Sequence, residues 1–328
     1  MINFCQFGAG RIGAIHAGNI ARHSDARLQI VVDPDRAAAE RLAARYGAQV
    51  GSQTEALADP AINAVVIASS TDTHADLVEA ASRAGKAIFC EKPLDLDRRR
   101  AAACVAVARE CGVALMVGFN RRFDPHFAKV ESEIRAGRIG RPELLTIKSY
   151  DPAPPSIEFV RRSGGLFRDM MIHDLDMACW LLGEEPVEVF ARGSVLVDPA
   201  IGEAGDFDTA VATLSMPSGA LCQIAGTRRA VYGYDQRIEV LGAKGALHAE
   251  NVVESTVIFH GPDGIVGDKP LPFFLERYAE AYRRELDHFI QSVARGAAPL
   301  VGGAEGIRAL ALAHAADQSA RTGQVVKI

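Results

Sequence analysis

The stretch that decides the fold of the first half of the chain is residues 2–13, INFCQFGAGRIG. Its first six residues are apolar enough for a buried strand, and glycines at positions 8, 10 and 13 follow at once. One glycine permits a tight turn, the next lets a ligand approach the backbone, and the third lets a helix pack closely on the strand. A helical apolar pattern from Ile15 to about His23 and a second strand over residues 28–32 complete a strand–turn–helix–strand unit.

An acidic residue at the end of the second strand, Asp33, indicates what this unit binds. It lies twenty residues after Gly13, where a carboxylate accepts hydrogen bonds from the adenosine ribose of a dinucleotide and repels a 2′-phosphate. A purely structural glycine turn is the alternative, but the acid spacing favours a nucleotide site. We predict NAD rather than NADP, with Arg36 leaving partial accommodation of a phosphate open. The predicted cofactor contacts in this unit are Gly8, Gly10, Arg11, Ile12 and Asp33.

Strands and helices alternate up to about residue 120 and predict an open parallel sheet of the α/β class, a Rossmann domain. Further strands are expected over 48–50, 64–68, 87–89 and 114–117, and helices over 34–46, 54–57, 75–84 and 97–111. Ligands of such sheets lie at the carboxyl ends of the strands. The sequence therefore places a cofactor site where these strands end.

Two polar segments follow strands of this sheet. Ser69, Thr71 and His74 come after the strand at 64–68, and we predict that they contact the cofactor, although helix capping also explains Thr71. Glu91 and Lys92, which we also predict to contact the cofactor, come after the strand at 87–89, before a proline whose peptide bond is able to be cis. A lone lysine is usually a surface charge, but one at this edge of a nucleotide-binding sheet indicates a functional residue.

The pattern changes after residue 120, and we predict two domains, 1–120 and 121–328. A chain of 328 residues exceeds the ~250–300 at which a single core usually stops growing. Strands expected over 144–149, 187–196, 208–216, 221–230, 236–241, 245–248 and 255–260 predict an α+β domain with a mostly antiparallel, open-faced sheet. Helices are expected over 125–136, 164–183, 275–295 and 304–321, and the last is able to pack back on the first domain.

The predicted helix at 164–183 carries ionisable residues among apolar ones, a pattern typical of an active site. Asp169, His173 and Asp176 would share one helical face, because they are spaced by four and three residues. A satisfied internal Asp–His pair is the bland alternative. A metal site at His173, Asp174 and Asp176 is weaker still, because Asp174 would point about 100° away from His173. We predict no metal.

Composition excludes several classes of function. Lysine and arginine number 36 against 41 acidic residues, a net charge of −5 without a basic patch, so no nucleic-acid partner is predicted. No apolar run reaches the ~20 residues of a membrane span, and no secretory signal is visible. None of the six cysteines shows metal-ligand spacing, so they are expected to be reduced. We predict a soluble, cytoplasmic protein.

The chain resembles the Gfo/Idh/MocA oxidoreductase family along essentially its whole length. The shared motifs, in the same order, are Gly8–Gly13, Glu91-Lys92-Pro93, GFNRRFDP from Gly118 and GGxxxDxxxHD from Gly164. The resemblance is greatest to members that oxidise inositols, through NRRFD at 120–124, the YDPAPP loop at 150–155 and YGYD at 232–235. It implies a Rossmann domain that binds NAD, a second domain that binds a cyclic polyol, and a homotetramer.

The resemblance also implies roles for single residues. Lys92 resembles the lysine that orients and polarises the reacting hydroxyl, while Asp169 and His173 resemble the catalytic aspartate–histidine pair. The substrate contacts it implies are Arg121, Asp151, Tyr234 and Tyr282, with Tyr232 a substitute for Tyr234. Some relatives have His and Asn where this chain has Ser149 and Asp151, which leaves the preferred stereoisomer open.

The function implied is NAD-dependent oxidation of a secondary alcohol of a cyclic polyol, first of all myo-inositol to its 2-ketone, with His173 as general base. Another inositol isomer or an aldose remains an alternative substrate. A non-catalytic sensor of NAD and sugar is the alternative from another class. Retention of Lys92, Asp169 and His173 together argues against the sensor.

Overall fold

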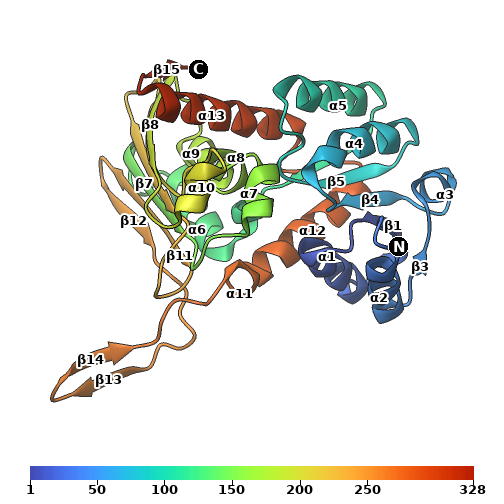
Figure 1. Ribbon diagram of the computed structural model, residues 1–328, viewed down its shortest axis with the longest axis horizontal. Coiled ribbons are helices and arrows are strands. Elements are labelled where there is room, and N and C mark those ends of the chain that lie inside the picture. Colours follow the sequence, from blue (N-terminus) through green and yellow to red (C-terminus); the bar gives the residue numbers. More distant parts are fainter. The chain divides into compact units, whose positions relative to one another are not determined.

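The computed structural model describes residues 1–328 and divides into two compact units (Figure 1). Unit 1 comprises Met1–Phe123 and Ala281–Leu310, and unit 2 comprises Asp124–Glu280 and Ala311–Ile328. Helix α12 (Ala279–Arg295) runs from the end of unit 2 into unit 1, and helix α13 (Gly303–Thr322) runs back into unit 2. None of the helices combines the length and apolar character that crossing a bilayer requires.

Unit 1 is built on a six-stranded parallel sheet in the order β3-β2-β1-β4-β5-β6, which confirms the predicted Rossmann sheet. Its strands are β1 (Ile2–Phe7), β2 (Ala26–Val32), β3 (Gln49–Val50), β4 (Ala64–Ile67), β5 (Ala87–Glu91) and β6 (Leu115–Gly118). Its further helices are α1 (Arg11–Arg22), α2 (Arg36–Tyr46), α3 (Gln53–Ala58), α4 (His74–Arg83) and α5 (Arg98–Glu110), with 3₁₀ helices η1 (Thr71–Thr73) and η2 (Asn120–Phe123).

Helix α12 supplies part of the core of unit 1. Phe289 lies against Phe4 of β1 and Phe89 of β5, with ring centroids 6.2 and 5.8 Å apart, and all three rings are fully buried. Fully burying such a ring contributes roughly 1.5–3 kcal/mol. A helix that begins only at Ala279 therefore completes the core of the sheet that starts at Ile2.

Unit 2 contains a seven-stranded mixed sheet in the order β12-β11-β7-β10-β9-β8-β15. Its strands are β7 (Pro142–Tyr150), β8 (Glu188–Ser194), β9 (Thr209–Ser215), β10 (Leu221–Thr227), β11 (Asp235–Gly242), β12 (Gly245–Ala249) and β15 (Val326–Lys327). The neighbouring strands β7 and β10 run parallel. The predicted antiparallel sheet is corrected on this point, because β7 enters between β10 and β11 instead of pairing with its sequence neighbour.

The predicted helix at 164–183 is also corrected, because it is two helices. Unit 2 has α6 (Pro125–Arg135), α7 (Ile157–Ser163), α8 (Leu166–Asp169), α9 (Ile172–Leu182), α10 (Pro199–Glu203) and α11 (Phe274–Arg277). The chain turns at Met170 and Met171 between α8 and α9. The start of α8 is fixed by Asp206, whose two carboxylate oxygens both accept from the Leu166 N–H at 3.1 Å. The positive φ of Gly165, +86°, suits glycine there.

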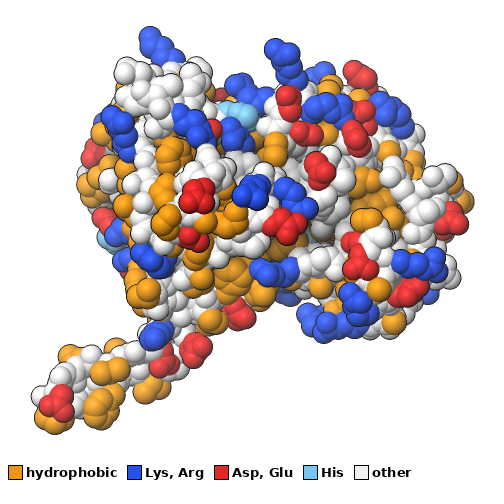
Figure 2. Space-filling model, viewed as in Figure 1, with side chains coloured by type: hydrophobic (Ala, Val, Ile, Leu, Met, Phe, Trp, Pro, Cys, Tyr) orange, Lys and Arg blue, Asp and Glu red, His pale blue; other side chains and the backbone are white.

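A separate hairpin replaces the last strand predicted for the sheet. Strands β13 (Ile258–Gly261) and β14 (Gly264–Gly267) pair only with each other. The hairpin extends away from the sheet of unit 2 (Figure 1), and Figure 2 shows hydrophobic side chains along it. Its exposed apolar residues are Val257, Ile258, Phe259, Ile265 and Val266.

Candidate active site

The glycine turn of unit 1 leaves room where a ligand would approach. A Cβ on Gly8 would lie 2.4 Å from the carbonyl oxygen of Ala68, and one on Gly13 would lie 2.2 Å from that of Gly8, so neither position accepts a side chain. A Cβ on Gly10 would meet nothing within 4 Å. Gly10 is also the N-cap of α1 and makes no side-chain cap. The first N–H groups of α1 therefore face open space with the partial positive charge that binds phosphates.

Helix α1 begins at Arg11, immediately after this turn and four residues earlier than the apolar pattern predicted. The predicted cofactor residues Arg11 and Ile12 thus form the first turn of the helix, with Arg11 exposed and Ile12 half-buried. Their backbone N–H groups belong to the phosphate-facing end of α1. The predicted helix was too short at its start, because glycine and arginine add nothing to an apolar periodicity.

Asp33 lies beside the same turn. Its Oδ2 accepts from the backbone N–H of Ala9 at 2.7 Å, and its Oδ1 accepts from that of Asp35 at 2.8 Å. A carboxylate has about four lone-pair sites, so two remain for ribose hydroxyls. The glycine turn, the open end of α1 and Asp33 together fit a dinucleotide such as NAD.

Replacing Asp33 with alanine is expected to raise the KM for NAD by roughly 10–100-fold, because hydrogen bonds to a charged group contribute about 1.5–3 kcal/mol. Discrimination against NADP should fall at the same time, since the charge that repels a 2′-phosphate is removed. Steady-state kinetics with both cofactors measure this. Asp35→Ala is the control, because Asp35 caps α2 by accepting a hydrogen bond from the Ala38 N–H. The KM of this variant for NAD should stay near that of the unaltered chain.

The predicted residues after β4, Ser69, Thr71 and His74, lie in a segment held by hydrogen bonds. Ser69 Oγ lies 2.7 Å from Thr73 Oγ1, and Thr71 begins η1. The ring of His74 is buried between two carbonyl oxygens, with Nδ1 2.8 Å from that of Pro93 and Nε2 3.2 Å from that of Ser69. Burial lowers the pKa of His74, which favours the neutral ring, and a neutral ring donates to one of these two oxygens. His74 thus joins the loop after β4 to the loop after β5, while direct contact with the cofactor stays a prediction.

The predicted residues Glu91 and Lys92 lie at the carboxyl end of β5, Glu91 as its last residue and Lys92 in the loop that follows. Glu91 is buried and Lys92 half-buried, and the Lys92–Pro93 peptide bond is cis. Glu91 Oε1 lies 2.7 Å from Nε2 of His16 on α1. The structure thus places Lys92 at the carboxyl end of β5, on the same edge of the sheet as the glycine turn.

Two predicted substrate residues also belong to unit 1. Arg121 lies in η2, directly after β6, and is 4% exposed. Tyr282 lies on α12, where its ring meets the ring of His16 edge-on at 5.9 Å. Both side chains are therefore held in the packed part of unit 1, and their contact with a substrate stays a prediction.

In unit 2 the predicted pair Asp169 and His173 is the accessible part of a buried segment. Every residue of α9 up to Leu181 is buried except His173, and Asp169 ends α8 half-buried. Asp174 and Asp176 are 0% and 1% exposed, and Asp174 accepts a hydrogen bond from Ser149 Oγ. Asp169 and His173 therefore keep part of their surface exposed, whereas Asp174 and Asp176 belong to the core.

Arg228, at the end of β10, brings two predicted residues together, and the sequence did not predict its role. Its Nη1 donates to Asp169 at 3.0 Å and lies 3.5 Å from Asp151, and its side chain is 3% exposed. Burial alone would lower the pKa of Arg228, but the charges of Asp169 and Asp151 raise it above its usual value. The sequence signal was a double arginine, Arg228-Arg229, at the end of an alternating strand.

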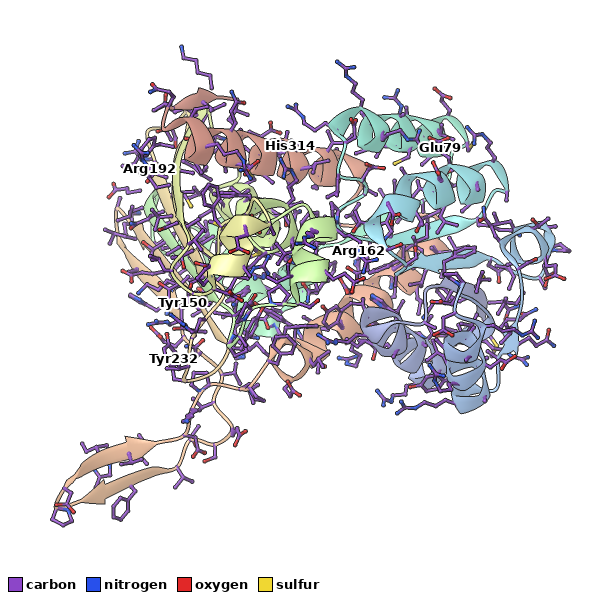
Figure 3. All side chains as sticks on the ribbon, viewed as in Figure 1. Glu79, Tyr150, Arg162, Arg192, Tyr232 and His314 are labelled. Atoms are coloured by element: carbon purple, nitrogen blue, oxygen red, sulfur yellow. The ribbon has the colours of Figure 1, made fainter.

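The two candidate tyrosines of unit 2 differ in their partners. Tyr232 donates to Asp235 at 2.5 Å, and burial and this bond raise the pKa of Tyr232 to about 12. Figure 3 shows Tyr232 near Tyr150, at one end of the sheet of unit 2. Tyr234 is 5% exposed, and its ring lies 5.9 Å from that of Tyr278. Asp235, which is fully buried, also accepts from Arg237 and Asn251, so this aspartate is a structural hub.

The phenylalanine variants of these tyrosines are expected to behave differently. Tyr232→Phe should cost stability of about 0.5–1.5 kcal/mol by removing one hydrogen bond, and should leave the KM for the polyol within threefold. Tyr234→Phe should raise that KM by roughly 3–10-fold if its hydroxyl binds substrate. Urea unfolding and steady-state kinetics on both variants measure this. A raised KM for the polyol in Tyr232→Phe, with an unchanged KM in Tyr234→Phe, would assign the substrate contact to Tyr232.

Both units match one family of oxidoreductases. Residues 2–119 match the Gfo/Idh/MocA oxidoreductase family's NAD-binding Rossmann fold, and residues 131–328 match its C-terminal alpha/beta domain. The chain therefore belongs to the Gfo/Idh/MocA oxidoreductase family and is an NAD-dependent dehydrogenase with a Rossmann domain.

Its relatives are more particular. The chain is 50% identical to an inositol 2-dehydrogenase of Rhizobium meliloti, over 100% of this chain and 99% of the relative. It is 46% identical to a myo-inositol 2-dehydrogenase of Thermotoga maritima, over 98% and 97% of the two chains. The crystal structure of the scyllo-inositol dehydrogenase from Lactobacillus casei, with NAD(H) and scyllo-inositol bound, superimposes with a TM-score of 0.93 at 29% identity and covers 100% of this chain and 99% of that one.

Proposed function

We propose that this chain oxidises myo-inositol at C2 to the corresponding ketone with NAD, a reaction that would serve inositol catabolism. The observation that carries this proposal is the full-length identity of about half to an inositol 2-dehydrogenase, together with an intact set of Lys92, Asp169 and His173. The proposed division of labour gives NAD binding to residues 1–120 and binding of the polyol to residues 121–328.

The proposed chemistry assigns each polar group one task. NAD, when bound, accepts the hydride that leaves the carbinol carbon. His173 takes the hydroxyl proton, because imidazole has an unperturbed pKa near neutrality. Asp169 orients His173 and stabilises the imidazolium, and Lys92 stabilises the negative charge that develops on the alkoxide oxygen. Arg121, Asp151, Tyr234 and Tyr282 hold the remaining hydroxyls.

In the proposed mechanism, Arg228 partly neutralises the negative charge of Asp169. A negatively charged carboxylate favours the protonated form of a neighbouring imidazole, and that form does not accept a proton. The ion pair between Arg228 and Asp169 offsets part of that charge. The proposed base can then remain neutral before the reaction and accept the proton during it.

A substrate panel tests the proposal. The purified chain is supplied with NAD and each of several inositols and aldoses, and NADH is followed at 340 nm. Ranking by kcat/KM should place myo-inositol first. A higher value for scyllo-inositol or an aldose would change the substrate. The end of β7 with Ser149, and Asp151 directly after it, is where that difference would arise. No NADH with any polyol would support the sensor alternative.

A tetramer and a cytoplasmic location complete the proposal. The outward face of the sheet of unit 2 exposes apolar side chains that a partner copy would cover, namely Leu144, Phe190, Val211, Leu221 and Leu241. The apolar hairpin β13–β14 offers a second contact surface. All six cysteines are free thiols, as is usual for proteins of a reducing compartment. Light scattering after size-exclusion chromatography should give about four times the 35.0 kDa of one chain.

A further inference from the structure

Three ionisable side chains meet inside unit 1, beneath the loop that carries Lys92. They are His16 of α1, Glu91 of β5 and Glu285 of α12, and their ligand-type atoms lie within 4.8 Å of one another. His16 and Glu91 are bonded at 2.7 Å. Glu285 is 0% exposed, and neither of its carboxylate oxygens has a hydrogen-bond partner. The mechanism above gives Glu285 no task.

A buried carboxylate without a partner cannot readily keep its charge. Ionised, Glu285 would be desolvated and would also face the negative charge of Glu91. Burial and the nearby Glu91 charge both raise the pKa of Glu285 well above its usual range. The neutral acid is therefore the form that fits this pocket.

A metal ion is a poorer explanation of the cluster. Two ligand atoms bound to one ion at ~2.1 Å lie about 3 Å or more apart. Nε2 of His16 and Oε1 of Glu91 are 2.7 Å apart, which is a hydrogen-bond distance. A hydrogen bond joins the two side chains directly and leaves no room for a cation between them.

The cluster connects directly to Lys92. Glu91 Oε2 faces the backbone N–H of Lys92 at 3.3 Å. A Cβ on Gly118, the neighbour of Glu91 in the sheet, would lie 2.9 Å from the same oxygen, so glycine provides the room for this carboxylate. The position of the Glu91 side chain is thus coupled to the start of the Lys92 side chain.

The geometry points to Glu285 as a positioning residue, held as the neutral acid, that lets Glu91 stay between His16 and the Lys92 N–H. An ionised Glu285 would repel Glu91 and disturb the place of Lys92 in the site. The consequence for catalysis rests on the proposed role of Lys92; the protonation state of Glu285 does not.

The titratable groups around the cluster of His16, Glu91 and Glu285 come from several elements. Glu91 and Lys92 lie on β5 and its loop, His16 on α1, and Tyr282 on its own helix, edge-on to His16. His74 of α4 feels the charge of Glu91 as well. Among them Glu91 is the one whose charge acts directly on Glu285.

The first test is the pH dependence of stability in Glu285→Gln, which keeps the shape of the neutral acid. The raised folded-state pKa means that unfolding releases a proton above about pH 4.3, so stability is lost as pH rises. The unfolding equilibrium constant of the unaltered chain, divided by that of the variant, should rise about tenfold per pH unit until the folded-state pKa is reached. A flat ratio would overturn the neutral acid. Should this variant fail to fold, Glu285→Met carries the same comparison.

Asp287→Asn is the matched control for this measurement. Asp287 lies two residues further along α12, is partly exposed and pairs with His23 at 3.0 Å. The ratio of unfolding equilibrium constants between the unaltered chain and Asp287→Asn should not rise tenfold per pH unit. One divalent metal ion per purified chain, lost in Glu285→Gln, would replace the proposal with a metal site.

The second test is the pH–rate profile with NAD and myo-inositol. Glu285→Gln should keep kcat within about threefold at neutral pH, and its activity should persist to higher pH than that of the unaltered chain. Profiles of the same shape would overturn the positioning role even where the stability slope is present. An unaltered chain without activity would refute the proposed function instead, and the stability test would still decide the state of Glu285.

Discussion

Replacing His173 with alanine is expected to lower kcat by about 10²–10⁴-fold, the usual contribution of a positioned general base. His173 is the accessible residue on an otherwise buried helix, and its ring is the group in that segment suited to accept a proton near neutral pH. The affinity for NAD should stay unchanged, because the glycine turn and Asp33 belong to unit 1. Initial rates with myo-inositol and fluorescence titration with NADH measure the two quantities.

His248→Ala is the control for this variant. His248 lies in the same unit on β12, and its side chain is half-exposed and faces Glu239. Its removal should leave kcat within about twofold, since surface substitutions away from special features have small effects. Should His173→Ala turn over myo-inositol as fast as His248→Ala, another group must accept the proton.

The predictable part of the molecule depended on local sequence. The turn at Gly8–Gly13 could be recognised because each glycine has a steric reason that its neighbours reveal, and Asp33 follows at a fixed spacing. The parallel strands of unit 1 followed from short β-branched runs such as AVVI at 64–67. For this reason, most helices and strands predicted from the sequence are present in the structure as the predicted type.

The unpredicted part depended on partners far apart in the sequence. The parallel pairing of β7 with β10 joins residues 144 and 221, and no local pattern encodes that register. The start of α8 depends on Asp206, forty residues away. Glu285 looks like an ordinary helical glutamate until the fold buries it against Glu91. Periodicity predicts which residues are buried, whereas charge partners emerge only from the three-dimensional structure.

Arg228→Met is expected to destabilise the chain by roughly 3–5 kcal/mol, the cost of removing one partner from a buried ion pair. Asp169 and Asp151 would keep their negative charges without the guanidinium that now lies between them. Lysine at this position should recover only part of the loss, because a single ammonium group cannot reproduce the fork of donors. Urea unfolding monitored by circular dichroism gives the free energies.

Arg229→Met separates this effect from the general loss of a positive charge. Arg229 is the exposed neighbour, and its contacts are long ones to the carbonyl oxygens of Leu196 and Val197. Its removal should change stability by less than about 0.5 kcal/mol. Equal stability of the two variants would mean that Asp169 and Asp151 do not depend on Arg228. The proposed effect of Arg228 on the charge of Asp169 would then lose its basis.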